Sequence, residues 1–204
     1  MNPLDLVKLT PLMERTSGKP EIVIGLIDGP VAMNHPDLAD GNIREIPGKI
    51  TGSCTQNSSN ACRHGTFVAG ILSARRDSVA PAICPKCTLL LRPIYKEEVS
   101  DKTKIPTASP EELTEAIFDI VSAGAMVINL SSALTQQSSR NERKLEEALN
   151  YAANRGVLVV AAAGNQGEIG SSTITRHPWV IPVAASTISG KPIKHRFSLL
   201  SKPS

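Results

Sequence analysis

The sequence has few aromatic residues and no clustered positive charge. Aromatic side chains make up 3% of its 204 residues, and no run of lysine or arginine is longer than two. Surfaces that bind nucleic acids usually carry a basic stripe, often with stacking aromatics, and a net charge of +3 spread along the chain provides none. We therefore expect no nucleic-acid partner.

Long apolar runs and a secretory leader are also lacking. No apolar run approaches the roughly 20 residues that a membrane-spanning helix requires, so we expect no membrane partner. The N-terminus lacks the charged segment followed by an apolar stretch that is typical of a signal peptide, and it leaves no room for a folded propeptide. We expect a cytoplasmic protein, or a secreted one if the chain is a trimmed mature form.

Phosphate-binding loops are absent as well. Doubly wound sheets often bind nucleotides, but the first predicted strand here runs into Asp28-Gly-Pro. It is not followed by a Gly-x-Gly-x-x-Gly or a Gly-Lys-Ser loop. We expect no nucleotide and no other cofactor.

Short apolar runs alternate with amphipathic segments along the whole chain. The runs that predict strands are 22–27, 88–94, 126–130, 157–162 and 179–184. Helices are predicted near 4–15, over 64–73, after Ser109, and over 141–154, and residues 40–63 form a polar loop. Alternation of strands and helices at this spacing implies an α/β fold with a parallel sheet and right-handed crossovers. With 41% hydrophobic residues, we expect residues 1–204 to form a single domain.

Two of the predicted helices have informative sequences. In the one between Ser109 and Gly124, Ser109 fits the N-cap, Pro110 the first helical position, and Glu112 completes a capping box. Gly124 fits the C-terminal stop. The inward positions of this helix are Leu113, Ala116, Ile117, Ile120 and Val121; in the helix over 64–73, Phe67, Val68, Ile71 and Leu72 share one face.

The four cysteines are open to three interpretations. Cys84-Pro-Lys-Cys87 has the spacing of a redox or metal-binding pair, but Cys54 and Cys62 lie too far apart to complete a zinc site. We expect two local disulfides, Cys54–Cys62 and Cys84–Cys87. Free thiols and a metal site are the alternatives, and we expect no bound metal.

Three polar residues lie where parallel strands end. Asp28 ends the first strand, Asn165 follows the strand at 157–162, and His64 opens a helix after a loop. In open α/β sheets the carboxyl ends of the strands form the functional site, so these side chains are expected to converge. Taken singly, each fits an ordinary structural role in a turn, a cap or the solvent.

The segments around these residues resemble three of the four catalytic blocks of the subtilisin-like serine proteases, the subtilases. They are Ile22-Val-Ile-Gly-Leu-Ile-Asp28, His64-Gly-Thr-Phe-Val-Ala-Gly70 and Val159-Val-Ala-Ala-Ala-Gly-Asn165. Asn34-His-Pro-Asp-Leu38 adds to the likeness, which extends over residues 20–198. The resemblance implies a subtilisin-like three-layer sandwich with a central, mostly parallel sheet.

The resemblance also implies a role for each site residue. A serine nucleophile needs a base to remove its proton, and a buried carboxylate orients that base. Asp28 matches the carboxylate, His64 the base, and Asn165 the donor to the oxyanion. Ser131, Ser132 and Ala133 match a strand that pairs with an extended peptide. The implied activity is hydrolysis of peptide bonds in a peptide or protein substrate.

The fourth block, a Gly-Thr-Ser segment that opens a helix, is not among the 204 residues. We therefore expect the C-terminal part of the domain to be missing, either by truncation or because a second polypeptide carries the serine. The alternative is a non-catalytic, peptide-binding pseudoprotease. Within the family, Leu26-Ile-Asp-Gly-Pro-Val31 looks most like the cyanobactin maturation proteases, which cut leaders from ribosomally made precursor peptides.

Overall fold

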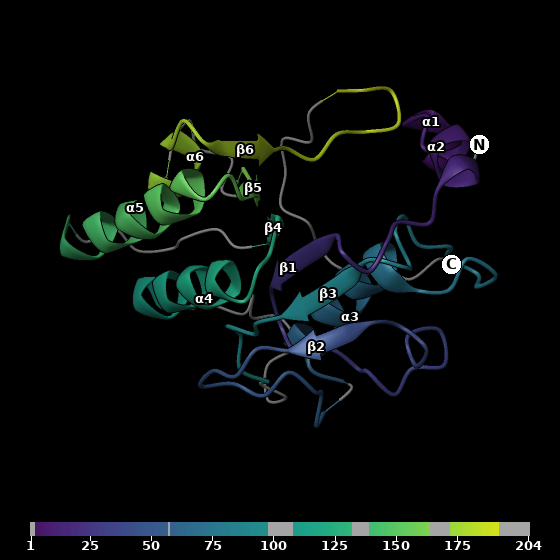
Figure 1. Cartoon of the computed structure of the whole chain (residues 1–204), viewed down its shortest axis with the longest axis horizontal. Helices are drawn as coiled ribbons and strands as arrows, with labels where there is room; N and C mark the ends of the chain where they lie inside the picture. The colour runs from purple at the N-terminus through teal and green to yellow at the C-terminus, as the bar shows by residue number, and fades with distance from the viewer. Residues whose placement is uncertain (1–2, 57, 98–107, 132–138, 164–171, 192–204) are drawn as a thin grey trace.

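A six-stranded parallel sheet forms the centre of the molecule. The computed structural model describes residues 3–56, 58–97, 108–131, 139–163 and 172–191 (Figure 1). The strands lie in the order β2-β3-β1-β4-β5-β6, and every pair formed by the described residues is parallel, as predicted. The strand bounds are β1 Val23–Ile27, β2 Ile43–Glu45, β3 Thr88–Leu91, β4 Val127–Leu130, β5 Leu158–Ala162 and β6 Val180–Val183.

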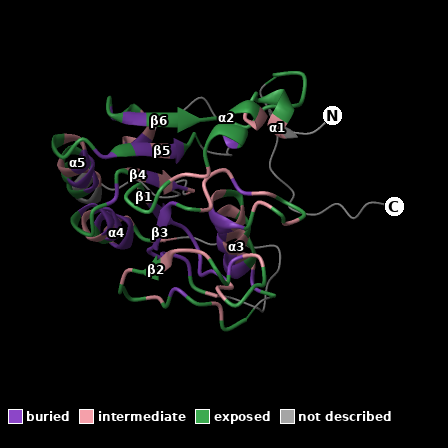
Figure 2. Ribbon diagram, turned by 45° about the vertical axis from the view of Figure 1, so that its right-hand side comes forward, coloured by how far each residue is buried: buried purple, intermediate pink, exposed green. Residues whose placement is uncertain are grey.

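Helices cover both faces of this sheet and make three layers. α4 and α5 pack together on one face, and α3 packs on the other face behind β1 and β3 (Figures 1 and 2). None of the helices in the described part of the chain is long and apolar enough to cross a bilayer. The helix bounds are α1 Pro3–Leu6, α2 Thr10–Arg15, α3 Asn60–Ser73, α4 Pro110–Ser122, α5 Ser139–Asn154 and α6 Thr173–Arg176.

The structure differs from the sequence prediction at several short elements. The lead-in helix is divided into α1 and α2, with Lys8 between them at a φ of 56°. The polar loop at 40–63 contains β2, a three-residue edge strand with little buried surface to mark it. α3 begins at Asn60 because the Ser59 side chain caps it by accepting a hydrogen bond from the Cys62 amide at 3.1 Å. α6 was not predicted either.

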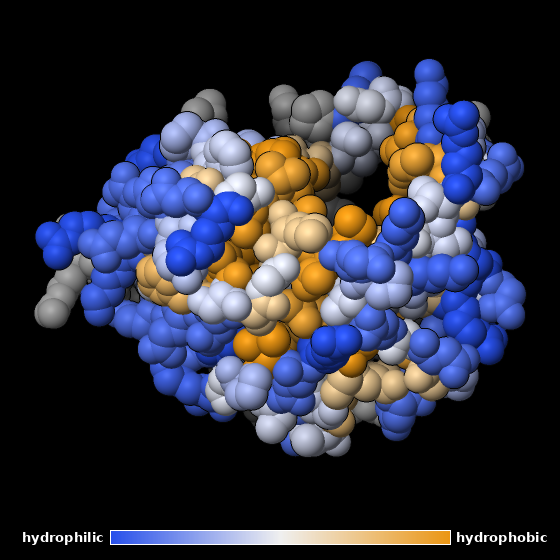
Figure 3. All heavy atoms as spheres, viewed as in Figure 1, coloured by the Kyte–Doolittle hydropathy of each residue, from blue (hydrophilic) through white to orange (hydrophobic). Residues whose placement is uncertain are grey.

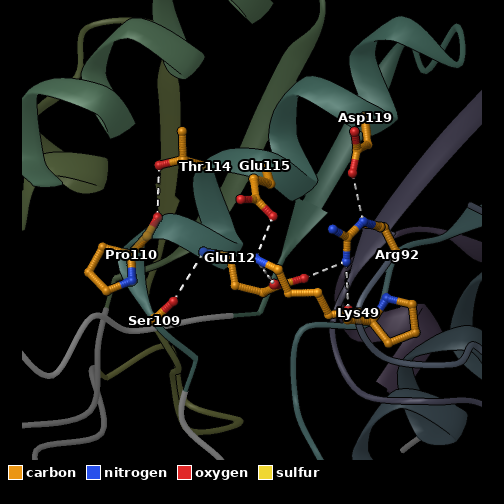
Figure 4. Close-up of polar contacts among 9 residues, drawn as sticks. Lys49, Arg92, Ser109, Pro110, Glu112, Thr114, Glu115 and Asp119 are labelled. Carbon is orange, nitrogen blue, oxygen red and sulfur yellow. Dashed lines mark hydrogen bonds and ion pairs between the residues drawn. The ribbon is translucent and has the colours of Figure 1, made fainter. Parts of the chain in front are cut away.

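The start and end of α4 follow the prediction, but the capping box does not form. Ser109 is the N-cap, and its side chain accepts a hydrogen bond from the Glu112 amide at 3.1 Å. Gly124 ends the helix at a φ of 93°. The Glu112 carboxylate turns instead to the buried Arg92, 2.7 Å from its Nη1 (Figure 4). A buried guanidinium must be paired, and this requirement outweighs the local cap. The predicted inward positions of α4, from Leu113 to Val121, are all buried.

Half of one sheet face is left uncovered by the described residues. Along β5, Val159 and Ala161 are buried under α5, whereas Leu158 on the other face is exposed. Ile181 and Val183 of β6 are also about half exposed, at 48% and 52%. Figure 3 shows apolar side chains gathered at the centre of the molecule, in the region of β1, β4 and β5.

α3 adds to the exposed apolar surface. Val68 and Leu72 pack against the core on this side of the sheet, but Phe67 and Ile71 are exposed. The apolar face predicted for this helix is therefore only partly covered by the core. Apolar patches of this kind mark surfaces that meet another partner.

Candidate active site

Asp28 lies at the carboxyl end of β1, between the ends of β3 and β4. It is buried, and its Oδ1 accepts a hydrogen bond from the Gly29 amide at 2.7 Å. The next residue has to be glycine, since a Cβ on Gly29 would lie 2.1 Å from the carbonyl oxygen of Ala61 in α3. The first turn of α3 therefore comes directly against the end of β1.

His64 of α3 points at the Asp28 carboxylate. Its Nδ1 lies 2.7 Å from Asp28 Oδ1, and its side chain is partly exposed. The hydrogen bond to Asp28 raises the pKa of His64 above its ordinary value, although partial burial of the ring opposes this. Since a carboxylate is an acceptor, Nδ1 carries the proton in this pair and Nε2 is the nitrogen left to act as a base.

The end of β4 lies next to this pair. Ser131 follows β4, and its carbonyl oxygen accepts a hydrogen bond from the Tyr95 hydroxyl at 3.2 Å. The Asn129 amide group donates to Ser131 Oγ at 2.8 Å. Ser131 is thus held at the same sheet edge as Asp28, and its pairing with substrate stays a prediction.

The remaining predicted site residues lie outside the described part of the chain. These are Ser132, Ala133 and Asn165. The strand that leads to Asn165 is described as far as Ala163, and it runs parallel to β4 with Ala161 beside Leu130. Their roles stay predictions.

The loop before α3 is fastened to the site by a disulfide and by a carboxylate. Cys54 and Cys62 form the first of the two expected disulfides. The Glu97 carboxylate accepts hydrogen bonds from the amides of Thr55 and Gln56, both at 2.9 Å, and from the Ser59 hydroxyl at 3.3 Å. Partial burial alone would raise the pKa of Glu97, but these hydrogen bonds outweigh it and lower the pKa.

The second expected disulfide is not formed. Cys84 and Cys87 are free thiols on a turn in which the Cys87 amide donates to the Cys84 carbonyl at 3.0 Å. Burial, and then the neighbouring Cys87, raise the pKa of Cys84 to about 12. The raised pKa leaves little thiolate, which is the form that attacks to make a disulfide.

The described residues contain one group with metal-ligand chemistry, Cys54, Cys62 and Glu97, whose ligand atoms lie within 4.8 Å of one another. The two sulfurs are joined in the disulfide, and the Glu97 carboxylate is already engaged by the loop. The disulfide sulfurs are not thiolates and the Glu97 carboxylate is not free, so this group lacks the ligands that a metal would need.

Sequence reasoning missed Tyr95 and Glu97. Both follow β3, the strand beside β1, and so lie at the sheet edge where parallel α/β proteins place their sites. That rule could have found them, because both also come directly after the predicted strand at 88–94.

A parallel α/β sheet that sets a buried aspartate against a histidine at the ends of its strands has the acid–base half of a serine-protease triad. The sequence model of the Subtilase family matches residues 19–192. The chain belongs to the subtilase family.

Two curated relatives show the likeness in sequence. The thermophilic serine proteinase of Bacillus sp. (strain AK1) is 33% identical over 172 residues, which cover 83% of this chain and 39% of the relative. Thermitase of Thermoactinomyces vulgaris is 33% identical over 170 residues, covering 80% of this chain and 54% of thermitase. The chain thus spans about half the length of these relatives.

Solved structures of maturation proteases share the fold. The prenylagaramide maturation protease PagA superposes with a TM-score of 0.75 at 29% identity, over 91% of this chain and 62% of PagA. The patellamide maturation protease PatA gives a TM-score of 0.66 at 29% identity, over 87% of this chain and 61% of PatA. The predicted subtilisin-like fold and the family resemblance are confirmed.

Proposed function

We propose that this chain supplies the general base and its orienting carboxylate to a serine endopeptidase. The observation that carries the proposal is the 2.7 Å contact between His64 Nδ1 and the buried Asp28 carboxylate. Asp28 holds the proton on Nδ1, so Nε2 takes the proton of a serine hydroxyl as the hydroxyl attacks a peptide carbonyl. Asp28 then stabilises the imidazolium, which returns the proton to the leaving amine.

The rest of the machinery is proposed from the family resemblance. Asn165 would donate a hydrogen bond to the oxyanion of the tetrahedral intermediate. The backbone of Ser131, Ser132 and Ala133 would pair with an extended substrate. The hydrogen bond from Tyr95 to the Ser131 carbonyl supports this, because it fixes the start of that segment.

The serine nucleophile would come from polypeptide outside residues 1–204. Support comes from the open half of the sheet, where Leu158, Ile181 and Val183 are exposed, and from the exposed Phe67 of α3. An apolar surface of this kind favours a further segment packed against it. A continuation of the same chain and a separate polypeptide would both serve.

The substrate class we propose is a ribosomally made precursor peptide that loses its leader. PagA and PatA are named as maturation proteases, and each is 29% identical to this chain. The proposal predicts cleavage at a leader boundary and little cleavage of unrelated proteins.

The compartment stays a prediction. A cytoplasmic protein was expected, but the Cys54–Cys62 disulfide favours an oxidising compartment. Fractionation of the source cells, with the thiol state trapped by alkylation, decides between them.

Cleavage assays on the complete protein test the function. His64→Ala and Asp28→Ala should each lower the rate of precursor cleavage by more than about 100-fold, because general-base catalysis is worth roughly 10²–10⁴-fold. His35→Ala is the matched control, since His35 is an exposed histidine that accepts a hydrogen bond from the Asp37 amide. Peptide binding without turnover in the parent protein would instead identify a pseudoprotease.

A further inference from the structure

A ring of contacts connects Asp28 and His64 through the Cys54–Cys62 disulfide. Three residues after Asp28, the Val31 carbonyl accepts a hydrogen bond from the Cys54 amide at 3.1 Å. Cys54 is joined to Cys62, which lies two residues before His64 in α3. His64 closes the ring through its 2.7 Å contact with Asp28.

The contact between Val31 and the loop is a short parallel bridge. The Val31 amide donates to the Gly52 carbonyl at 2.8 Å, and Val31 pairs with Ser53. Val31 and Gly52 are buried, whereas Ser53 is exposed. The loop that carries Cys54 is therefore anchored to the segment that follows Asp28.

The disulfide connects this loop to the first turn of α3. Cys62 is buried and Ser59, the N-cap, is also buried, whereas Cys54 is partly exposed. A second tie joins the same two segments, since the Ala32 amide donates to Thr66 Oγ1 at 2.9 Å. Thr66 lies beyond His64 and Cys62 lies before it, so the two ties hold α3 on both sides of the histidine.

We propose that the Cys54–Cys62 disulfide is a positioning element of the Asp28–His64 pair, and that reducing it loosens the contact between the two side chains. The reaction needs a dithiol, which gives two electrons and two protons to the disulfide and closes its own disulfide. Cys54 and Cys62 are left as thiols. The consequence for peptide cleavage rests on the proposed function, but the positioning does not.

The test reads the His64 ring directly in the complete protein. The titration of each histidine Cε1–H is followed by NMR in the oxidised chain, in the chain reduced by dithiothreitol, and in a Cys54→Ser/Cys62→Ser variant. We expect the pKa of His64 to lie above about 6.5 in the oxidised chain and to fall towards that value in the other two. The ring nitrogens of His35 and His177 bond to Asp37 and Asn150 and not to Asp28, so their signals serve to identify the His64 resonance.

A Cys84→Ser/Cys87→Ser variant is the matched control, because it removes the two free thiols and leaves the disulfide in place. It should keep the elevated pKa of His64 and lose it on reduction, as the parent does. An unchanged His64 titration in a reduced, folded chain overturns the proposal. Loss of the whole fold on reduction, seen by circular dichroism, also overturns it, because the disulfide would then be a general stabiliser. Neither result depends on whether the protein cleaves peptides.

Discussion

Gly65 of α3 lies directly against the carbonyl oxygen of Gly29, so that a Cβ on Gly65 would stand 2.4 Å from it. This close approach brings His64, the preceding residue, within hydrogen-bond distance of Asp28. Backbone packing between a helix and the loop after a strand thus contributes to the separation between the Asp28 carboxylate and the His64 ring.

Gly65→Ala should separate α3 from the end of β1. The obstacle is backbone and not a flexible side chain, so we expect a loss of about 1–3 kcal/mol in the free energy of unfolding, as for other overpacked sites. The pKa of His64 should fall at the same time. Gly70→Ala is the control: nothing lies within 4 Å of its Cβ, and alanine favours the helix by about 0.5–1 kcal/mol. Urea unfolding of both variants measures this, and equal effects would contradict the packing account.

Asp28→Asn should change how stability depends on pH. The pKa of His64 is raised in the folded chain, so its contribution to stability is fully present below about 6.5 and is lost as pH rises through the folded pKa. The asparagine variant lacks the carboxylate that raises the pKa, so this contribution should vanish. Urea unfolding of both proteins at several pH values from 5.5 upward provides the measurement. A stability difference that stays constant across this range would show that the pair does not couple to protonation.

The open half of the sheet should make the isolated chain associate. Ile181 and Val183 expose about half of their surface on the edge strand β6. We expect the 204-residue chain to bind a hydrophobic dye and to form oligomers in sedimentation experiments. Ile181→Lys/Val183→Lys should reduce both effects.

Val79→Lys is the control for this experiment, because Val79 is fully exposed in the loop between α3 and β3. It should leave dye binding and association as they are. A monomeric parent chain that binds no dye would show that the apolar face needs no cover.

Arg92 should be essential to the packing of α4 against the sheet. It is almost completely buried, with Nη1 at 2.7 Å from Glu112 and Nε at 2.9 Å from Asp119 (Figure 4). Arg92→Met leaves the largely buried Glu112 without this partner, and breaking such a pair costs about 3–5 kcal/mol. Lys49→Met removes the exposed cation that also pairs with Glu112, at 3.2 Å, and should cost about 1 kcal/mol or less. Similar urea midpoints for the two variants would contradict this ranking.

The sequence predicted best what depends on neighbouring residues. The cap at Ser109, the inward positions of α4 and the stop at Gly124 follow from local spacing, and all appear in the structure. The Asp28–His64 contact joins residues 36 apart, yet it could be predicted because Asp28 ends a parallel strand and His64 lies near the start of a helix that follows a loop at the same edge of the sheet.

The features that were wrong or missed depend on contacts from distant parts of the chain. Glu112 satisfies the requirements of Arg92 rather than those of its own helix, and Glu97 caps a loop about 40 residues away. The raised pKa of Cys84 depends first on its burial, which the Cys-x-x-Cys spacing does not report. β2 is an edge strand of three residues, too short to leave a pattern of its own.

The central claim is that His64, oriented by Asp28, activates a serine on polypeptide outside residues 1–204. Fluorophosphonate labelling of the protein purified from its source, read by intact mass of every polypeptide present, tests it most directly. We predict one label on a serine outside these residues, in a continuation of the chain or in a second chain, and its loss in His64→Ala but not in His35→Ala. Absence of label on every polypeptide of the folded preparation would contradict the claim.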